Sequence, residues 1–343
     1  MSSSSPAASD VPGSAPAPQV VEDCLGIVQL LSDGTVRRSA DYSALPRKGG
    51  VPSGLPVQWK DVVYDATHAL RLRMYRPTGG QDGATIGGGK KLPVLVYFHG
   101  GGFCIASFEL PNFHAGALRL TAELPALVLS TDYRLAPEHR LPAAHDDAEA
   151  VFSWLRAQAA SAAADPWLAE SADFDRVFVC GDSAGGNISH HIAVRHGSGQ
   201  LALDPLRLAG CVMLWPYFGG EERMPSEAAC PANYVMGTAL FDQMWRLALP
   251  AGATRDHPAA NPFGPGSVPL DTVNAFPPVL IVDPEHDALH DRVADYVARL
   301  KAAGKPLELV VFAGQGHGFF VMDPCGEASD ELIRVIRRFV HGG

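Results

Sequence analysis

The sequence lacks closely spaced cysteine pairs. Its six cysteines form no C-x-x-C pair and lie far apart, at Cys24, Cys104, Cys180, Cys211, Cys230 and Cys325. This spacing argues against zinc ribbons and redox-active dithiols, and it favours a reducing compartment. Cys180 and Cys211 lie within apolar runs, where cysteine is usually a small core residue.

Long apolar runs and an excess of basic residues are also missing. No stretch reaches the ~18 consecutive apolar residues of a membrane span, and the formal net charge is -10. We therefore expect neither a membrane nor a nucleic-acid partner, because nucleic-acid binding needs clustered positive charge. Residues 1–18 have no basic start and no apolar segment, and Arg37 is the first arginine. They predict a disordered tail rather than a secretory signal. With the cysteine spacing, we expect a cytoplasmic or nucleocytoplasmic location.

The sequence does contain a regular alternation of strand and helix patterns. Short apolar runs typical of strands buried on both faces occur at 93–98, 126–130, 176–180, 209–216, 277–283 and 307–312. Helical stretches are predicted at 114–124, 142–159, 184–196, 287–303 and 328–340. This alternation predicts βαβ units and a mostly parallel sheet, that is, an α/β fold.

Five features of the sequence depart from this alternation. Partial alternation predicts antiparallel strands at 57–64 and 70–75, and Asp33-Gly34 predicts a turn between two short apolar runs. The glycine-rich segment 78–91 has no phosphate-binding motif and is expected to be a loop. Residues 217–262 form an insertion.

The heptapeptide GDSAGGN at 181–187 lies between a predicted strand and a predicted helix. G-x-S-x-G in this setting is typical of a nucleophile elbow, a sharp turn that exposes the serine hydroxyl. Gly181 and Gly185 would allow the strand and helix to approach closely. We therefore predict that Ser183 is a nucleophile.

A serine nucleophile needs a base, and the base needs an orienting acid. His317 lies in a glycine-rich loop after the last predicted strand. In folds with a nucleophile elbow, the catalytic residues follow the chain order Ser, acid, His, and His317 fits the last position. The orienting acid is expected at or after the end of the predicted strand 277–283. Four acidic residues there qualify by type: Asp283, Glu285, Asp287 and Asp291. Asp287 is preferred because its loop position can approach His317, with Asp283 as the second choice and Asp291 as a helix-face residue.

Residues 99–103 read HGGGF and follow the strand pattern PVLVYF. Backbone N–H groups stabilise a tetrahedral oxyanion only if its oxygen lies about 3 Å from them. We expect Gly100 and Gly101, together with Ala184, to form this oxyanion hole, and Gly102 to be a further candidate. The predicted reason for the glycines is that a β-carbon would obstruct the substrate.

Together, HGGGF, DYRLAPEHRLPAAHDDA (132–148), GDSAGGN and the late HGF resemble the hormone-sensitive-lipase group of α/β-hydrolases. Within it the chain resembles plant carboxylesterases, relatives of the gibberellin receptor, and is most similar to the carboxylesterase 15-like branch. The resemblance covers about residues 20–340. It implies an α/β-hydrolase domain at 19–343, a Ser183, Asp287 and His317 triad, and lid segments at about 19–50 and 217–262.

The resemblance also implies a serine carboxylesterase that acts on small or hormone-like esters, and members of this branch are implicated in strigolactone cleavage. The alternatives are a hormone-binding receptor with a vestigial triad, and an amidase or long-chain lipase. A small-molecule ester is the expected partner, with no obligate protein partner, cofactor or metal.

The pocket walls are predicted less directly. The aromatic residues near the motifs or in the insertion are candidates for substrate binding or for the core: Phe103, Phe108, Phe218, Phe241, Trp245 and Phe319. Leu25, Leu30 and Leu31 are candidate contacts from the N-terminal segment, and Glu138 is expected to have a structural role near the site.

Overall fold

The fold is seen in a computed structural model of the chain, which describes residues 17–78 and 91–342. The predicted tail at 1–18 and the glycine-rich segment 78–91 therefore lie almost entirely outside the described residues. Within the described residues, no helix is both long and apolar enough to cross a membrane.

A sheet of eight strands forms the centre of the molecule, in the order β11-β10-β9-β8-β6-β7-β5-β4. Its strands are β4 (Val57–Asp65), β5 (Leu70–Pro77), β6 (Leu92–Phe98), β7 (Leu127–Thr131), β8 (Ala172–Asp182), β9 (Leu208–Leu214), β10 (Val279–Pro284) and β11 (Leu307–Phe312). Strand β5 is antiparallel to both neighbours, and the pairs from β7 to β11 are parallel. The predicted mostly parallel sheet is thus confirmed.

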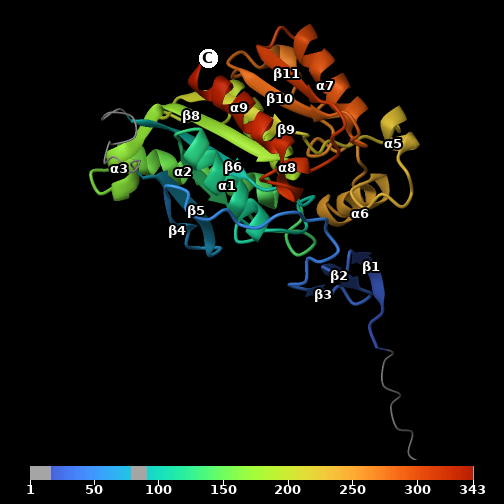
Figure 1. Cartoon of the computed structure of the whole chain (residues 1–343). Helices are drawn as coiled ribbons and strands as arrows, with labels where there is room; N and C mark the ends of the chain where they lie inside the picture. Colours follow the sequence, from blue (N-terminus) through green and yellow to red (C-terminus); the bar gives the residue numbers. More distant parts are fainter. Residues whose placement is uncertain (1–16, 79–90, 343) are drawn as a thin grey trace, which may run out of the picture.

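Helices cover both faces of this sheet because successive side chains of its strands point to opposite faces. On β6, Val94 and Val96 pack into one core, and Leu95 and Tyr97 pack into the other. The first core receives α2 (Ala143–Ala160), α4 (Ala184–Gly197) and α7 (His290–Ala302). The second receives α1 (Pro111–Glu123) and α9 (Glu327–His341), which lie together in front of the sheet in Figure 1.

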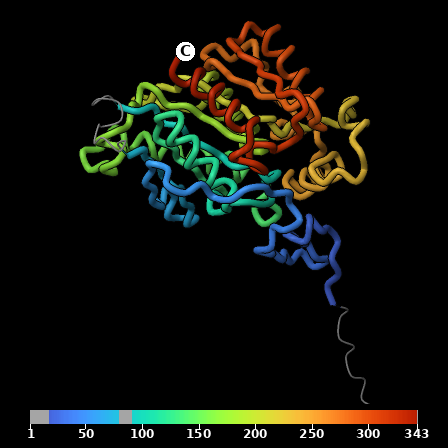
Figure 2. Tube along the Cα trace, viewed as in Figure 1, coloured from blue at the N-terminus to red at the C-terminus, as the bar shows by residue number. Residues whose placement is uncertain are grey.

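A small separate sheet lies at the N-terminal side. It has the order β1-β2-β3, with β1 (Val20–Cys24), β2 (Val28–Leu31) and β3 (Val36–Arg38). The β2–β3 connection contains Asp33-Gly34, as predicted, and Gly34 has φ +83°. Figures 1 and 2 show this N-terminal sheet beside helix α6 (Thr238–Ala248), the main helix of the insertion.

The remaining elements are short, and the sequence patterns did not identify them. They are α3 (Pro166–Ser171), α5 (Pro225–Ala229), the 3-10 turn η1 (Leu270–Thr272) and α8 (Phe319–Met322). Several predicted boundaries also differ from the structure, and the largest difference is at β8, which begins at Ala172 rather than at 176. Helix α1 begins at Pro111 rather than at 114, because proline is well suited to a first helical turn. Helix α7 begins at His290 rather than at 287, because Asp287 belongs to the preceding turn.

Candidate active site

Ser183 sits in a strained turn between β8 and α4. Its φ of +52° and ψ of -113° lie outside the regions that a non-glycine residue usually adopts. Its N–H donates to the Leu214 carbonyl at 2.9 Å, and its carbonyl accepts from Tyr217 N–H at 2.9 Å. These bonds to the end of β9 and to the chain that follows it hold the turn in place.

The two glycines that flank Ser183 are required by packing. A β-carbon on Gly185 would overlap the Phe98 carbonyl, and one on Gly181 would overlap the backbone of Gly185. Strand β6, strand β8 and helix α4 therefore approach more closely than any side chain permits. This is the close strand–helix approach that the sequence predicts for GDSAGGN.

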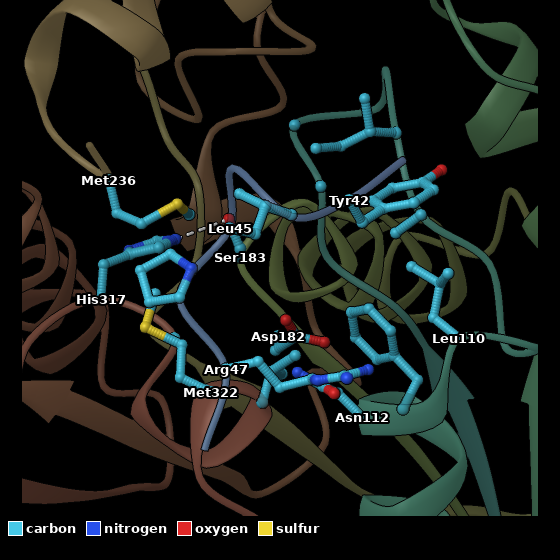
Figure 3. Close-up of a pocket in the computed structure, with 18 of the residues that line it drawn as sticks. Tyr42, Leu45, Arg47, Leu110, Asn112, Asp182, Ser183, Met236, His317 and Met322 are labelled. Carbon is cyan, nitrogen blue, oxygen red and sulfur yellow. Dashed lines mark hydrogen bonds between the residues drawn. The ribbon is translucent and has the colours of Figure 1, made fainter. Parts of the chain in front are cut away.

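Ser183, His317 and Asp287 form one hydrogen-bonded chain. The Ser183 Oγ lies 2.9 Å from His317 Nε2, and His317 Nδ1 lies 2.7 Å from Asp287 Oδ2 (Figure 3 draws the first contact). All three residues are buried: Ser183 is 6% exposed, His317 is 1% exposed and Asp287 is 3% exposed. We assign the imidazole proton to Nδ1 because an aspartate oxygen faces that nitrogen, which leaves Nε2 free to accept the Ser183 proton.

The other three acids considered from the sequence are engaged elsewhere. The Asp283 carboxylate lies 2.9 Å from His290 Nδ1, and Glu285 accepts from Gly314 N–H at 2.8 Å. The Asp291 carboxylate accepts from Ser226 N–H at 2.7 Å. Among the four, the structure brings Asp287 to His317.

The HGGGF turn differs from the expectation at Gly100. The Gly100 N–H donates to Asp182 Oδ1 at 2.9 Å, so it is not free to bind an oxyanion. Gly101 and Gly102 instead line the cavity beside Ser183. Within the described residues no acceptor is recorded for the N–H groups of Gly101, Gly102 or Ala184. The free donors are thus those of Gly101, Gly102 and Ala184, and Gly100 is corrected to a structural position.

The expected reason for the three glycines is also corrected. A β-carbon would overlap Asp182 Oδ2 at Gly100, the Ile105 carbonyl at Gly101, and Met244 Sδ at Gly102. In addition, φ is +108° at Gly101 and +58° at Gly102, which is the region where glycine is favoured. These three positions are therefore glycine because other atoms of the protein occupy the space that a β-carbon would need, rather than because a side chain would meet the substrate.

Asp182 is a buried carboxyl group beside the candidate nucleophile that sequence reasoning missed. Its Oδ1 accepts from Tyr97 Oη at 2.7 Å as well as from Gly100 N–H. Burial raises its pKa to about 6, against the lowering effects of the Tyr97 hydrogen bond and the nearby His317. The sequence signal that could have identified Asp182 is its position directly before the serine of G-x-S-x-G. Its contact with the HGGGF turn is tertiary and has no sequence pattern.

A cavity of about 650 Å³ opens onto Ser183 and His317. Its walls are mainly apolar and come from distant parts of the chain, as Figure 3 shows. The apolar lining includes Leu45, Ile105, Leu110, Phe113, Met236, Phe241, Met244, Val321 and Met322. Polar groups reach it from Asp41, Arg47, Asn112 and Asp182. A small number of polar groups in an apolar cavity is typical of a site for a small organic ligand.

Among the six aromatic residues predicted to bind substrate, only Phe241 lines this cavity. Phe103 and Trp245 pack on Tyr217 and on each other, and the Trp245 and Tyr217 rings stack at 4.1 Å. Phe108 lies under the Arg71 and Arg73 guanidinium groups, Phe218 packs on Tyr296, and Phe319 packs on Trp215. These five fill the core because large apolar rings are stabilised most by complete burial.

The N-terminal leucines do not line the cavity either. Leu31 is buried, and Leu25 and Leu30 pack against the core. The N-terminal contribution comes instead from residues 40–43 and 45–47. That segment is irregular, so no periodicity in the sequence could have identified it.

Residues 95–321 match the model of a family described as having the alpha/beta hydrolase fold. The chain belongs to this α/β-hydrolase family. The sheet order and the hydrogen-bonded chain at its carboxyl edge agree with the fold expected from the sequence.

The hydrolase has curated relatives among plant carboxylesterases. It is 34% identical to carboxylesterase 20 of Arabidopsis thaliana over 313 residues, which cover 90% of this chain and 93% of that protein. It is 37% identical to the chloroplastic tuliposide A-converting enzyme 1 of Tulipa gesneriana, with 85% and 72% covered. It is 35% identical to the 3-O-acetylpapaveroxine carboxylesterase of Papaver somniferum, with 77% and 83% covered.

Solved esterases share its three-dimensional fold. The esterase of Pyrobaculum calidifontis superposes with a TM-score of 0.68 at 28% identity, over 83% of this chain and 85% of that one. The metagenomic carboxylesterase EstE1 gives a TM-score of 0.68 at 27% identity, over 83% and 88%. With these relatives and neighbours, the hydrolase is a carboxylic ester hydrolase of the plant carboxylesterase group.

Proposed function

We propose that the hydrolase cleaves small or hormone-sized carboxylic esters through an acyl-enzyme on Ser183. The observation that carries this proposal is the buried contact chain from Ser183 Oγ to His317 at 2.9 Å and from His317 to Asp287 at 2.7 Å. A serine hydroxyl is a weak nucleophile alone, and an adjacent imidazole makes it reactive.

In the proposed cycle, His317 Nε2 takes the Ser183 proton while Oγ attacks the ester carbonyl carbon. His317 then gives this proton to the departing alkoxide, which leaves as the alcohol. Water then attacks the acyl carbon while His317 Nε2 takes its proton. His317 returns this proton to Ser183 Oγ as the bond from the acyl carbon to Oγ breaks, and the carboxylic acid leaves. Asp287 stays ionised, and it holds the imidazole orientation and stabilises the imidazolium that forms at each step.

Gly101, Gly102 and Ala184 are the proposed oxyanion donors. Ala184 is the first residue of α4, where unpaired N–H groups and the helix dipole favour negative charge. Loss of one such donor typically costs about 3 to 4 kcal/mol in the barrier. His99 Nδ1 lies 2.7 Å from the Gly100 carbonyl, and Gly100 N–H donates to Asp182 Oδ1 at 2.9 Å, so these contacts hold the start of the turn.

The cavity supports a substrate with an apolar acyl or alcohol part. Its size of about 650 Å³ suits a molecule of drug or hormone size. Strigolactone cleavage, which the sequence resemblance implies, belongs to this class, as do esters like those in the names of the tulip and poppy relatives. In this proposal residues 19–50 and 217–262 form the lid, and a cytoplasmic or nucleocytoplasmic location stays a prediction.

The test is hydrolysis of p-nitrophenyl acetate and butyrate by wild type, Ser183→Ala and Ser189→Ala. Ser189 is a matched control, since it lies on α4, which begins directly after Ser183, is fully buried, and donates to the Gly185 carbonyl instead of to a histidine. We expect Ser183→Ala to lose turnover at least about a thousandfold and Ser189→Ala to retain it. An organophosphonate should label Ser183 alone, as read by peptide mass spectrometry.

Equal turnover by wild type and Ser183→Ala would contradict the proposal. An inert wild type that binds a strigolactone tightly would favour the receptor alternative. Intact-protein mass spectrometry during incubation with strigolactones and simple esters separates a short-lived acyl-enzyme from a long-lived one, and parallel anilides and long-chain esters test the amidase and lipase alternatives.

A further inference from the structure

Arg38, the last residue of β3, contacts two buried carbonyls outside its own sheet. Its Nη1 donates to the Cys104 carbonyl and its Nη2 donates to the Ala136 carbonyl, each at 2.7 Å. Glu138 accepts from the same guanidinium, from Nε at 2.8 Å and from Nη2 at 2.7 Å. Cys104 is fully buried and Ala136 is 1% exposed, whereas the Arg38 side chain is 32% exposed. Among the described residues, Arg38 is the one recorded donor to either carbonyl.

The Cys104 carbonyl belongs to the turn that carries the proposed oxyanion donors. The N–H groups of Cys104 and Ile105 both donate to the Gly101 carbonyl, at 2.9 and 3.1 Å. Gly101, Gly102 and the non-glycine Phe103 all have positive φ, +64° at Phe103. A backbone in this region persists only where its surroundings hold it.

The second carbonyl that Arg38 binds is tied to the same turn. The Ala136 N–H donates to the Phe103 carbonyl at 2.8 Å. One guanidinium group therefore joins both chain segments that fix the turn, from Gly101 to Ile105 and from Ala136 to Glu138. The planar guanidinium of arginine can hold several acceptors in fixed directions, which lysine cannot do.

We propose that Arg38 is a positioning residue for the oxyanion turn, through which the N-terminal sheet supports catalysis indirectly. This inference rests on the proposed function. Donors act on an oxyanion only within a few tenths of an ångström of the right place, and a misplacement of about 1 Å can cost a hundredfold in rate. Arg38 does not touch the substrate, and it acts through Cys104 and Ala136.

The test compares Arg38→Met and Arg38→Lys with two controls. Arg37→Met removes the same charge from the neighbouring residue of β3, whose side chain is exposed. Arg246→Met removes the ion pair with Glu22 that attaches the N-terminal sheet to α6, without a contact to the oxyanion turn. Organophosphonate titration counts active sites, and kcat is expressed per titrated site.

We expect Arg38→Met to lower kcat about 10- to 100-fold with KM within about twofold of wild type. Arg38→Lys should lie between Arg38→Met and wild type, and both controls should keep kcat within about twofold. The inhibition constant of an aryl trifluoromethyl ketone, whose serine adduct carries an oxyanion, should rise by the same factor as kcat falls. A merely structural role would reduce the number of titrated sites and leave this constant unchanged.

Wild-type kcat per site in Arg38→Met, or an unchanged ketone inhibition constant, would overturn this inference and leave the proposed function intact. An inert wild type would instead overturn the proposed function. If thermal melting shows that Arg38→Met does not fold, Arg38→Lys carries the test by the same two measurements, and wild-type values there would also overturn the inference.

Discussion

At the scale of single residues, Asp182 links the candidate nucleophile to the HGGGF turn. Its Oδ1 accepts from Tyr97 Oη and from Gly100 N–H, and the residue is 3% exposed. Burial raises its pKa to about 6, above its ordinary value of 3.8. A shift of this size corresponds to about 3 kcal/mol against the ionised form in the folded protein. The turn is thus held by a carboxylate that lowers stability at neutral pH.

This carboxyl group predicts a specific pH dependence of stability. Because its pKa is higher in the folded than in the unfolded chain, the folded state binds more protons between about pH 4 and 6, and the free energy of unfolding falls as pH rises through that window. Asp182→Asn keeps the Oδ1 acceptor but cannot ionise. Between pH 5 and pH 7.5, we therefore expect its stability relative to wild type to improve by about 1 to 2 kcal/mol.

Urea unfolding of both proteins at the two pH values measures this difference. Asp283 has a pKa that burial also raises, to about 6, but it is present in both proteins and cancels in the comparison. If the free energy of unfolding changes equally with pH in wild type and Asp182→Asn, Asp182 does not titrate as predicted.

At the scale of elements, the N-terminal sheet and the segment after it are attached to the body of the molecule at several points. Glu22 pairs with Arg246 of α6 at 2.7 Å, and Arg38 binds the oxyanion turn. After the sheet, residues 40–43 and 45–47 line the cavity, and Lys48 N–H donates to the Met322 carbonyl at 2.7 Å. The segment therefore closes one side of the cavity and supports the turn beneath it.

Two truncations separate this segment from the residues that precede it. Deletion of residues 1–18 should leave kcat/KM unchanged, because β1 begins only at Val20 and its neighbour Gln19 makes the first contacts with Ser32. Deletion of residues 1–48 removes Arg38 and the N-terminal wall, and kcat/KM should fall at least about a hundredfold. Similar kcat/KM values for the two truncated proteins, measured per titrated site, would exclude a catalytic part for the segment.

At the scale of the whole molecule, the active site combines parts of unequal stability. Strand β10, which precedes Asp287, is buried throughout, and β8 is buried over residues 177–182, directly before Ser183. The Arg246–Glu22 pair that attaches the N-terminal sheet is partly exposed, at 57% and 22% for the two side chains. Exposed ion pairs contribute about 1 kcal/mol or less. Cys24, Ile27, Val28 and Leu31 attach the N-terminal sheet to the core, but β1 and β3 are otherwise mostly exposed. Regions with fewer buried contacts open at lower free energies than the core.

We therefore expect activity to be lost at a lower urea concentration than secondary structure. Activity assayed in urea should show a midpoint below that of far-UV circular dichroism, because the N-terminal segment opens before the sheet unfolds. Arg246→Met should lower the activity midpoint further and leave the circular dichroism midpoint nearly unchanged. Coincident midpoints in wild type would indicate that the segment and the sheet unfold together.

The sequence by itself determined the sheet and the chemistry of the site. Continuous apolar runs identified its buried strands, and the short motifs around Ser183 and His317 identified residues that the structure brings together with Asp287. These predictions succeeded because strand burial and a strand–turn–helix motif are local properties, and parallel strands bring the residues after them to one edge of the sheet.

Tertiary structure decided which donors are free, which residues line the cavity and what holds the oxyanion turn. Gly100 is occupied because Asp182 lies opposite it, five of the six aromatic candidates are core, and the cavity wall comes from irregular segments such as 40–47. The contact of Arg38 with Cys104 joins residues that are 66 positions apart. Such contacts depend on the direction of side chains after the elements have packed, and no periodicity along the chain records that direction.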